Sequence, residues 1–260
     1  MHTTIGDVSV SLNQHVAVVE IQRPPHNFFN VAMIKNLVEA FQSMDANPEC
    51  RAIVLASAGK SFCAGADFSS TPSEEDVGKP DARSPLYVEA ARLFDCKKPV
   101  VGAIHGAAIG GGMGLALVPD FRVGCAQASF SANFVKLGFH PGFALTLTLP
   151  EIVGQQKANR MFYTGCRIKG EQALEWGLLD ELVPQDQVRE QAIAFAQEIA
   201  VNAPLAVLSV RATMRQGLIE KIIRHTDHEG KEQQWQRETE DFKEGVRAVT
   251  ERRPGNFFGR

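Results

Sequence analysis

The sequence has few of the features that mark disulfide-rich, metal-binding or membrane proteins. It contains five widely spaced cysteines, namely Cys50, Cys63, Cys96, Cys125 and Cys166. Because their number is odd and they form no Cys-x-x-Cys pair, a disulfide framework and a structural zinc site are disfavoured, and a reducing compartment fits. No stretch reaches the about 18 apolar residues of a membrane helix, and the segment MHTTIGDVSVSLNQH lacks the pattern of a signal peptide. We therefore expect a cytoplasmic protein without a membrane partner.

The sequence also has no large excess of positive or negative charge. The formal net charge is -3 and the isoelectric point is near 6.2, so the chain produces no strong field for nucleic acid. With 260 residues, 44% of them hydrophobic, it can bury a core as one large domain or as one domain with a helical extension. A small-molecule partner is the expectation.

Two nucleotide-binding motifs are incomplete. Gly59, Lys60 and Ser61 resemble the end of a phosphate-binding loop, but Val54 stands where the motif needs its first glycine. The glycine-rich segment 110–115 lacks the last glycine of the dinucleotide fingerprint. We therefore expect no nicotinamide cofactor.

Metal-ligand spacing is weak as well. His225 and His228 lie three residues apart on a predicted helix, but neither a cysteine nor a third histidine nearby completes a metal shell. A solvated helix surface is the simpler interpretation, and we expect no metal.

Hydrophobic periodicity predicts an α/β fold followed by a helical section. The predicted strands are two within residues 8–22, one at 51–57, one at 99–105 and a short one around 178–183. The predicted helices begin after a cap at Asn30 and lie at 86–96, 115–118, 186–201, 204–216 and 218–248. The polar segment 71–85 is predicted to be a flap.

Two glycine-containing turns each follow an apolar strand: SFCAGAD at 61–67 and GAAIGGG at 106–112. Small residues let backbone N–H groups approach a ligand closely, and two such donors make an oxyanion hole. The alternative is purely structural, because glycine is the ordinary residue wherever a chain turns sharply.

Taken together, FCAGAD and HGAAIGGGMGLAL resemble the crotonase superfamily, the enoyl-CoA hydratase/isomerase family. The resemblance extends over the whole chain, through RPPHNFFN at 23–30, LGFHPG at 137–142, the stretch at 165–180 and the C-terminal FKEGVRAVTERRPGNFFGR. It implies a spiral core of ββα units at residues 1–200. Residues 201–260 would then form a helical section for trimerisation and for covering CoA.

The resemblance also implies roles for single residues. The backbone amides of Ala66 and Gly111 correspond to the pair that holds the thioester oxygen and stabilises an enolate. Ala64 and Asp67 match the turn on which the CoA adenine rests, and Asp67 is expected to cap a helix rather than to act as a catalyst. Arg252 and, less directly, Arg23 are candidates for the CoA phosphates. CoA enters as part of the substrate, so no separate cofactor is expected.

The two glutamates that family hydratases use as acid and base are both missing. Their positions hold Gly114 and Phe134, which cannot move protons, so hydration by the usual route is in doubt. His140 is the substitute candidate for proton transfer; alternatively, it only hydrogen-bonds its own loop. A set of phenylalanines is predicted to line an acyl pocket or to belong to the ordinary core: Phe68, Phe134, Phe139 and Phe143.

Three functions therefore stay open. The first is a crotonase-type reaction on an acyl-CoA, which includes hydrolysis, decarboxylation and C–C bond cleavage or formation. The second is a CoA-binding member without catalysis. The third, RNA binding, has little support in a chain of negative net charge that lacks a lysine-rich helix face. The resemblance further implies a homotrimer or a dimer of trimers.

Overall fold

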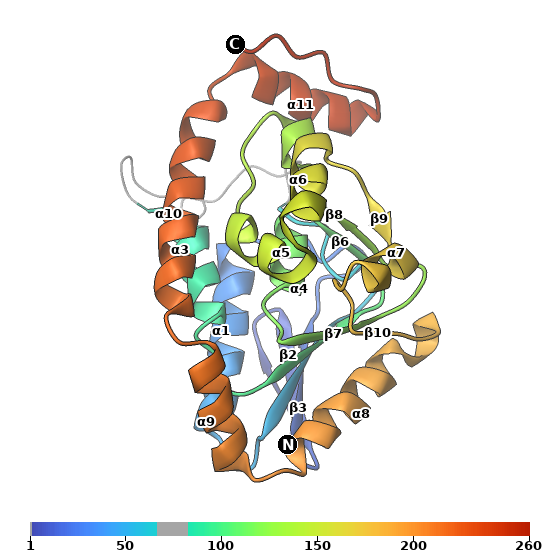
Figure 1. The fold of residues 1–260 in the computed structure, drawn as a ribbon, viewed down its shortest axis with the longest axis vertical. Coiled ribbons are helices and arrows are strands. Elements are labelled where there is room, and N and C mark those ends of the chain that lie inside the picture. The colour runs from blue at the N-terminus through green and yellow to red at the C-terminus, as the bar shows by residue number, and fades with distance from the viewer. Residues whose placement is uncertain (1, 67–82) are drawn as a thin grey trace.

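The computed structural model describes residues 2–66 and 83–260, and a seven-stranded sheet lies at its centre (Figure 1). The strand order is β1-β2-β3-β4-β5-β7-β10. The strands run from His2 to Ile5 (β1), Val8 to Asn13 (β2), Val16 to Ile21 (β3), Ala52 to Ser57 (β4), Val100 to Ile104 (β5), Phe121 to Gly124 (β7) and Glu181 to Leu182 (β10). Most of the predicted flap lies outside the described residues.

Two pairing modes divide this sheet. β1, β2 and β3 pair in antiparallel fashion, whereas β3, β4, β5, β7 and β10 are parallel. Every residue of β4 and β5 is buried, as expected for parallel strands that are covered on both faces. Because Ile21 pairs with Ser57, the segments that follow β3 and β4 leave the sheet at the same edge. The predicted hairpin and the strands at 51–57 and 99–105 are confirmed.

A small second sheet carries the glycine-rich turn. It consists of β6 (Ala107–Ile109), β8 (Ser129–Ser131) and β9 (Ile168–Lys169), in the order β6-β8-β9. The sequence predicts residues 106–112 as a turn alone, because a three-residue strand is too short to show periodicity. Helix α4 (Gly111–Ala116) follows β6 directly and is wholly buried.

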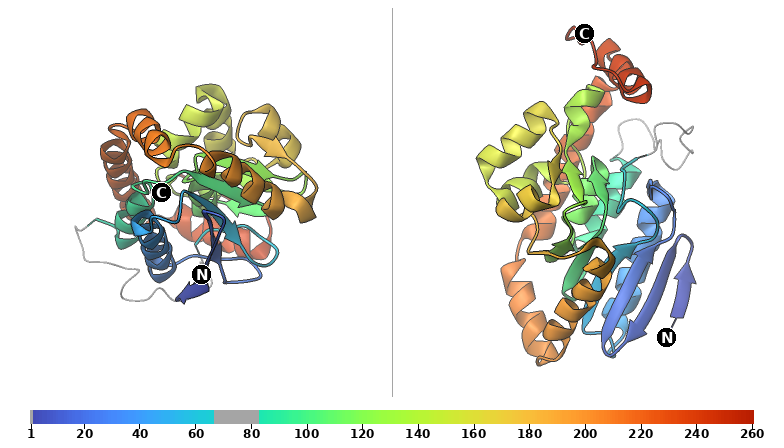
Figure 2. Two further views of the ribbon diagram at one scale, coloured as in Figure 1. Left: turned by 90° about the horizontal axis from the view of Figure 1, so that it is seen from below. Right: turned by 90° about the vertical axis from the view of Figure 1, so that its right-hand side faces the viewer.

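Helices cover both sheets, and Figure 2 shows them from two further sides. Asn30 caps α1 as predicted, because its side chain accepts a hydrogen bond from Met33 N. The predicted helix at 218–248 is two helices, since the chain breaks after Gln236 and Thr239 caps the second one. The helices are α1 (Val31–Ala46), α3 (Pro85–Leu93), α5 (Leu145–Val153), α6 (Gln155–Thr164), α7 (Gly170–Glu175), α8 (Val188–Ala200), α9 (Pro204–Met214), α10 (Leu218–Gln236) and α11 (Glu240–Glu251), with short 3-10 turns η1 (Asn133–Leu137) and η2 (Gln185–Gln187).

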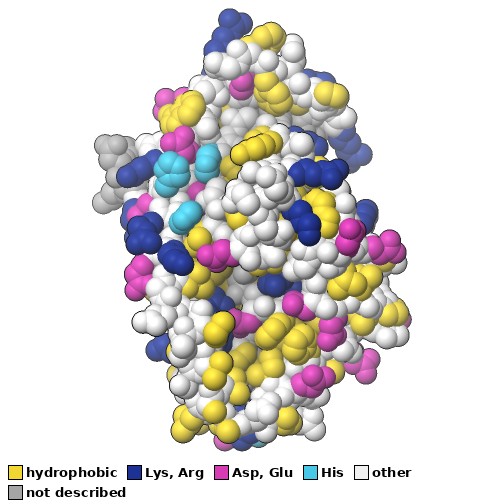
Figure 3. Space-filling view, in the orientation of Figure 1, with side chains coloured by type: hydrophobic (Ala, Val, Ile, Leu, Met, Phe, Trp, Pro, Cys, Tyr) yellow, Lys and Arg dark blue, Asp and Glu magenta, His cyan; other side chains and the backbone are white. Residues whose placement is uncertain are grey.

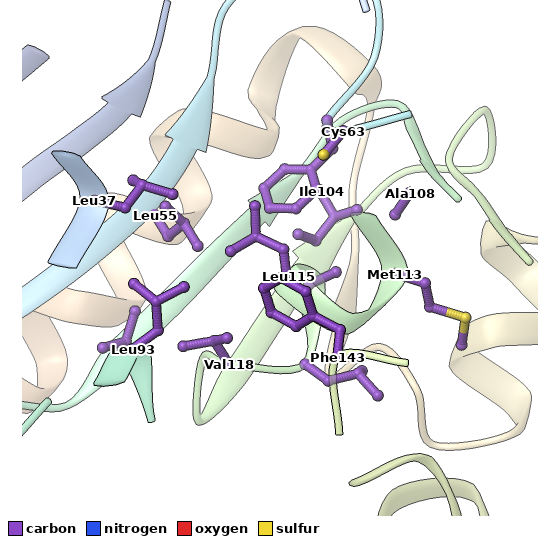
Figure 4. Packing of buried hydrophobic residues seen from close by; sticks show 14 of the residues in the cluster. Leu37, Leu55, Cys63, Leu93, Ile104, Ala108, Met113, Leu115, Val118 and Phe143 are labelled. Carbon is purple, nitrogen blue, oxygen red and sulfur yellow. The ribbon is translucent and has the colours of Figure 1, made fainter. Parts of the chain in front are cut away.

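The C-terminal helices lie along the α/β part of the chain. α10 packs against α3 and α5, and α11 packs against η1 (Figure 1). The buried core runs from β4 to α4, and Figure 4 shows Leu55 of β4, Ile104 of β5 and Leu115 of α4 within it. The α/β fold class is confirmed, whereas the division at residue 200 stays a prediction. In the described part of the chain, no single helix is long and apolar enough to span a membrane, although the bent pair formed by 185–200 and 204–214 passes by length and composition.

Candidate functional site

The first predicted donor, the N–H of Ala66, belongs to the segment that follows β4. Phe29 N donates to the carbonyl oxygen of Gly65 at 3.0 Å, so that carbonyl points toward Phe29. In a trans peptide the C=O and the following N–H point in opposite directions. The N–H of Ala66 therefore points away from Phe29. Gly65 has a φ of +93°, a conformation that suits glycine.

The second donor, the N–H of Gly111, lies at the start of α4. The carbonyl of Gly110 accepts from Met113 N at 3.0 Å and from Gly114 N at 3.3 Å, so it points into the helix. By the same peptide geometry, the N–H of Gly111 points out of the first turn. Gly110 is itself anchored, because its N–H donates to Ser131 O at 2.8 Å.

The two turns lie side by side. Cys63 N donates to Ala107 O at 2.9 Å, and Ile109 N donates to Cys63 O at 3.0 Å. A Cβ atom at Gly65 would come within 2.8 Å of Ile109 O and 3.7 Å of Gly111 N. The peptide that carries the Ala66 N–H is thus a direct neighbour of the one that carries the Gly111 N–H.

Phe29 contacts both turns, a role that the sequence analysis missed. Its backbone holds the Gly65 carbonyl, and a Cβ at Gly111 would lie only 2.4 Å from its Cζ atom. Its neighbour Asn27 is fully buried and donates to Ala58 O at 2.6 Å and to Ser61 O at 2.7 Å. The motif RPPHNFFN is recognisable in the sequence, but only the tertiary contacts show that Phe29 lies against both turns.

The positions of the missing glutamates are packed with aromatic side chains. A Cβ at Gly114 would be 2.6 Å from the Cβ of Phe143, so the present packing leaves no room there for a side chain. Phe143 is 1% exposed, and its ring packs against Phe29 with centroids 5.6 Å apart. The Cζ atom of Phe134 would lie 3.9 Å from a Cβ at Gly110. The surroundings of the two turns are therefore apolar on this side.

The predicted pocket phenylalanines fall into two groups. Phe134 packs on Phe139 at 5.4 Å, and Phe139 packs on Phe242 of α11 at 5.3 Å. Phe143 belongs instead to the pair with Phe29, within the core shown in Figure 4. Phe68 lies outside the described residues. A common role in binding an acyl group stays a prediction.

His140 lines a surface cavity of about 410 Å³ with Phe139, Asn159 and Tyr163. Neither of the two donor residues is among the described residues that line it. The Nδ1 atom of His140 lies 2.7 Å from Pro141 O, so Nδ1 carries a proton and Nε2 keeps its lone pair in the neutral ring. The loop hydrogen bond named above as the alternative is therefore present. Figure 3 shows histidines gathered on this face, where the ring of His228 lies 5.8 Å from that of His140.

The candidate CoA contacts are spread over the chain. Arg23 lies 3.5 Å from Asp7 and donates to the Asn30 side chain at 3.1 Å, so it is held close to the cap of α1. The N–H of Ala64 donates to His26 O at 3.0 Å. Arg252 is exposed just beyond α11. Asp67 lies outside the described residues, and the roles of all four in CoA binding stay predictions.

The thiol of Cys63, which belongs to the first turn, is unreactive. Burial raises the pKa of Cys63 to about 12, so its thiol stays protonated near neutral pH and does not act as a nucleophile. Among the residues that the structure describes, no three His, Cys, Asp or Glu side chains are grouped closely enough to hold a metal ion. What the turns offer is a pair of backbone donors beside apolar side chains.

A polar stripe on α10 was also missed. Glu229, Gln233 and Gln236 are spaced i, i+4 and i+7 on one helix face, and all three bind the loop between η1 and α5. The sequence predicts a solvated surface only for His225 and His228 of this helix, and it assigns no role to these three residues. The spacing alone was the available signal, because buried and exposed polar stripes look alike in a sequence.

The chain is similar over most of its length to proteins that act on CoA thioesters by their descriptions. The sequence profile described as enoyl-CoA hydratase/isomerase matches residues 11–260. A protein of Bacillus subtilis described as a probable enoyl-CoA hydratase is 32% identical over 97% of this chain and 98% of its own length. The carnitinyl-CoA dehydratase of Salmonella typhimurium is 33% identical over 80% of each chain.

Solved structures share the fold over nearly the whole chain. An enoyl-CoA hydratase/isomerase from Pseudoalteromonas atlantica superposes with a TM-score of 0.86 at 28% identity, covering 97% of this chain and 100% of its own. An enoyl-CoA hydratase from Bacillus anthracis gives 0.75 at 30% identity, covering 98% and 100%.

Proposed function

The chain belongs to the enoyl-CoA hydratase/isomerase family, and on this premise we propose that it acts on an acyl-CoA thioester through the backbone N–H groups of Ala66 and Gly111. The thioester oxygen accepts a hydrogen bond from each N–H. When a bond at the α carbon is made or broken, negative charge collects on that oxygen, and the two donors stabilise it.

The observation that carries this proposal is the direct contact between the two turns. A Cβ atom at Gly65 would lie close to Ile109 O and Gly111 N, and Phe29 contacts both turns. Donors held in place before the substrate arrives need no reorganisation during the reaction, which is the source of their catalytic effect.

The reaction we propose does not use two carboxylates. Gly114 and Phe134 bring no titratable group, and Phe143 fills the space beside Gly114. An enolate reaction that needs only one proton-transfer group, or one in which the substrate supplies the leaving group, fits this site better than a reaction that needs two carboxylates. His140 is the candidate for that proton, with Nε2 as the atom that accepts it. For this role, the cavity that His140 lines has to be continuous with the space in front of the Ala66 and Gly111 N–H groups when the substrate is bound.

The experiment uses acetoacetyl-CoA, whose enolate absorbs in the near ultraviolet. Wild-type protein is expected to produce the enolate band on binding. The variant Ala66→Pro lacks the N–H, so we expect the band to disappear and turnover of any acyl-CoA substrate to fall about a hundred- to a thousandfold. Ala66→Gly keeps the N–H and serves as the matched control.

Circular dichroism and urea denaturation show whether the proline variant is folded, because the turn that carries Ala66 is itself expected to bind CoA. If folded Ala66→Pro protein keeps the full enolate band, the proposed role of this N–H is wrong. A panel of acyl-CoAs, with products identified by mass spectrometry, distinguishes a catalyst from a protein that only binds them. His140→Ala in the same panel tests the histidine, and unchanged rates would remove it from the mechanism.

A further inference from the structure

The segment from His140 to Thr146 is held by three side chains of one face of α10, of which Glu229 and Gln233 are buried. His140 N donates to the side chain of Gln236 at 2.6 Å, and the Gln233 side chain donates to His140 O at 2.8 Å. Gln233 is itself fixed, because Tyr87 of α3 donates to it at 2.8 Å. Polar side chains buried with all their partners in place favour one conformation of the loop.

Glu229 makes the strongest contacts with this loop. It is fully buried, and its carboxylate accepts from Ala144 N at 2.8 Å, from Thr146 N at 3.0 Å and from Thr146 Oγ1 at 2.6 Å. Helix α5 begins at Leu145, and its cap residue Ala144 has no side chain that can accept from the first turn. Glu229 therefore acts in place of an N-cap side chain, from a different helix.

The turn that Glu229 holds has an unfavourable backbone. Phe143 has a φ of +63° and Ala144 a φ of +59°, and residues other than glycine rarely adopt such values. Such a conformation persists only where its surroundings impose it, and it is concentrated at functional sites. The three hydrogen bonds of Glu229 are one constraint on this turn, and the packing of Phe143 is another.

The same turn packs directly behind the donor pair. The Cβ of Phe143 fills the space at Gly114, three residues after Gly111 in the same short helix. Its ring packs on Phe29 at 5.6 Å, and the Phe29 ring lies against Gly111. A shift of Phe143 must therefore move Phe29, α4 or both, because the packed core leaves no free volume.

We propose that Glu229 is a positioning residue for the acyl-CoA site. Its carboxylate fixes the Phe143 turn, and Phe143 in turn keeps the N–H of Gly111 aligned with the thioester oxygen. This inference rests on the proposed function. It assigns to a helix of the C-terminal section a part in setting the strength of the oxyanion contact.

The test separates binding from enolate stabilisation. Glu229→Gln keeps the size of the side chain but removes the charge and one acceptor. We expect the enolate fraction of bound acetoacetyl-CoA to fall roughly tenfold, while the Kd of CoA, measured by calorimetry, changes less than about twofold. A residue that only stabilised the fold would leave the enolate fraction of folded protein unchanged. Glu220→Gln, an exposed glutamate on the same helix, is the control.

Two further variants keep the test decisive if Glu229→Gln folds poorly. Thr146→Val removes the hydroxyl contact with Glu229, together with the 3.2 Å contact of the same hydroxyl with His225, and is expected to lower the enolate fraction by a smaller factor. Phe143→Leu combined with Glu229→Gln is expected to be no worse than the more severe single variant, because both act along one path.

The outcomes are distinguishable. No enolate band with wild-type protein overturns the proposed function itself. A wild-type band that persists unchanged in Glu229→Gln and in Thr146→Val overturns only the role of Glu229, and so does full additivity with Phe143→Leu.

Discussion

Single atoms determine how closely the two donor turns approach each other. A methyl group at Gly112 would meet Cys63 O at 2.1 Å, and one at Gly111 would meet the Phe29 ring at 2.4 Å. Glycine is therefore required at both positions by contact with a neighbouring segment, and not only by the turn itself. The apolar ring of Phe29 lets the two backbones lie close without offering either N–H a competing acceptor.

Glu229 also makes a residue-scale contribution to the pH dependence of stability. Burial raises its pKa from 4.5 to about 7, against the opposing effect of its hydrogen bonds to Thr146 and Ala144. The folded state then binds more protons than the unfolded state between these two values. The stabilisation from this group is complete below pH 4.5 and is lost as the pH rises through about 7.

Glu229→Gln is therefore expected to flatten the dependence. Between about pH 5 and 8, wild-type protein should lose up to roughly 3 kcal/mol of unfolding free energy relative to the variant. Urea denaturation of both proteins at each pH measures the difference. Of the other groups near this site, Tyr87 on α3 does not titrate in this range, because burial and the Glu229 charge raise its pKa, whereas burial lowers the pKa of His225 on α10. Parallel curves would show that Glu229 does not titrate in this range.

Residue-scale prediction from the sequence succeeded where the signal is local. Asn30 precedes an apolar stripe and was identified as a cap, which the structure confirms. The contact between Glu229 and the turn at Phe143 could not be found in this way. Ala144 and Glu229 lie 85 residues apart in the chain, and the two left-handed residues, Phe143 and Ala144, are not glycines.

At the scale of elements, a charged cluster joins α9 to the sheet. Asp120, just before β7, accepts from Arg211 at 2.9 Å, from Arg215 at 2.6 Å and from Val100 N at 2.8 Å. All three charged side chains are at least four-fifths buried. Removing the carboxylate leaves two cations without their partner in a poorly solvated place.

We expect Asp120→Ala to lower the free energy of unfolding by about 3 kcal/mol, measured by urea denaturation. Glu240→Ala, which removes the exposed ion pair with Lys243, is the control and is expected to change stability little. Equal effects of the two substitutions would contradict a structural role for the Asp120 cluster.

Long elements were mostly easier to predict than short ones, although the two-residue β10 falls in the predicted extended piece at 178–183 and the predicted helix at 218–248 is two helices. The strand at residues 51–57 and the long helices appeared in the hydrophobic pattern, whereas the two- and three-residue strands β6, β8 and β9 did not. A strand of three residues owes its existence to its partner and not to its own composition. The candidate site lies at such a strand, so its motif was recognisable before its geometry.

At the scale of the whole molecule, helix α9 of the C-terminal section exposes large apolar side chains. The arginines of α9 face the sheet, while none of the helix is buried and Leu205 and Met214 are 81% and 80% exposed. Figure 3 shows hydrophobic side chains gathered at the lower end of the molecule, where α9 lies. An apolar face of this kind is typical of surfaces that become covered by another protein.

The expected homotrimer or dimer of trimers gives this face a use. We predict that the protein in solution has a mass well above that of one chain in size-exclusion chromatography with light scattering. Replacing both Leu205 and Met214 with glutamate should lower that mass, because burying two carboxylates without partners opposes association. Leu174→Glu places a carboxylate on an exposed apolar position of α7, outside the predicted trimerisation section 201–260, and should leave the mass unchanged. If wild-type protein is monomeric, or if all variants keep the same mass, α9 does not mediate assembly and its exposed side chains need another explanation.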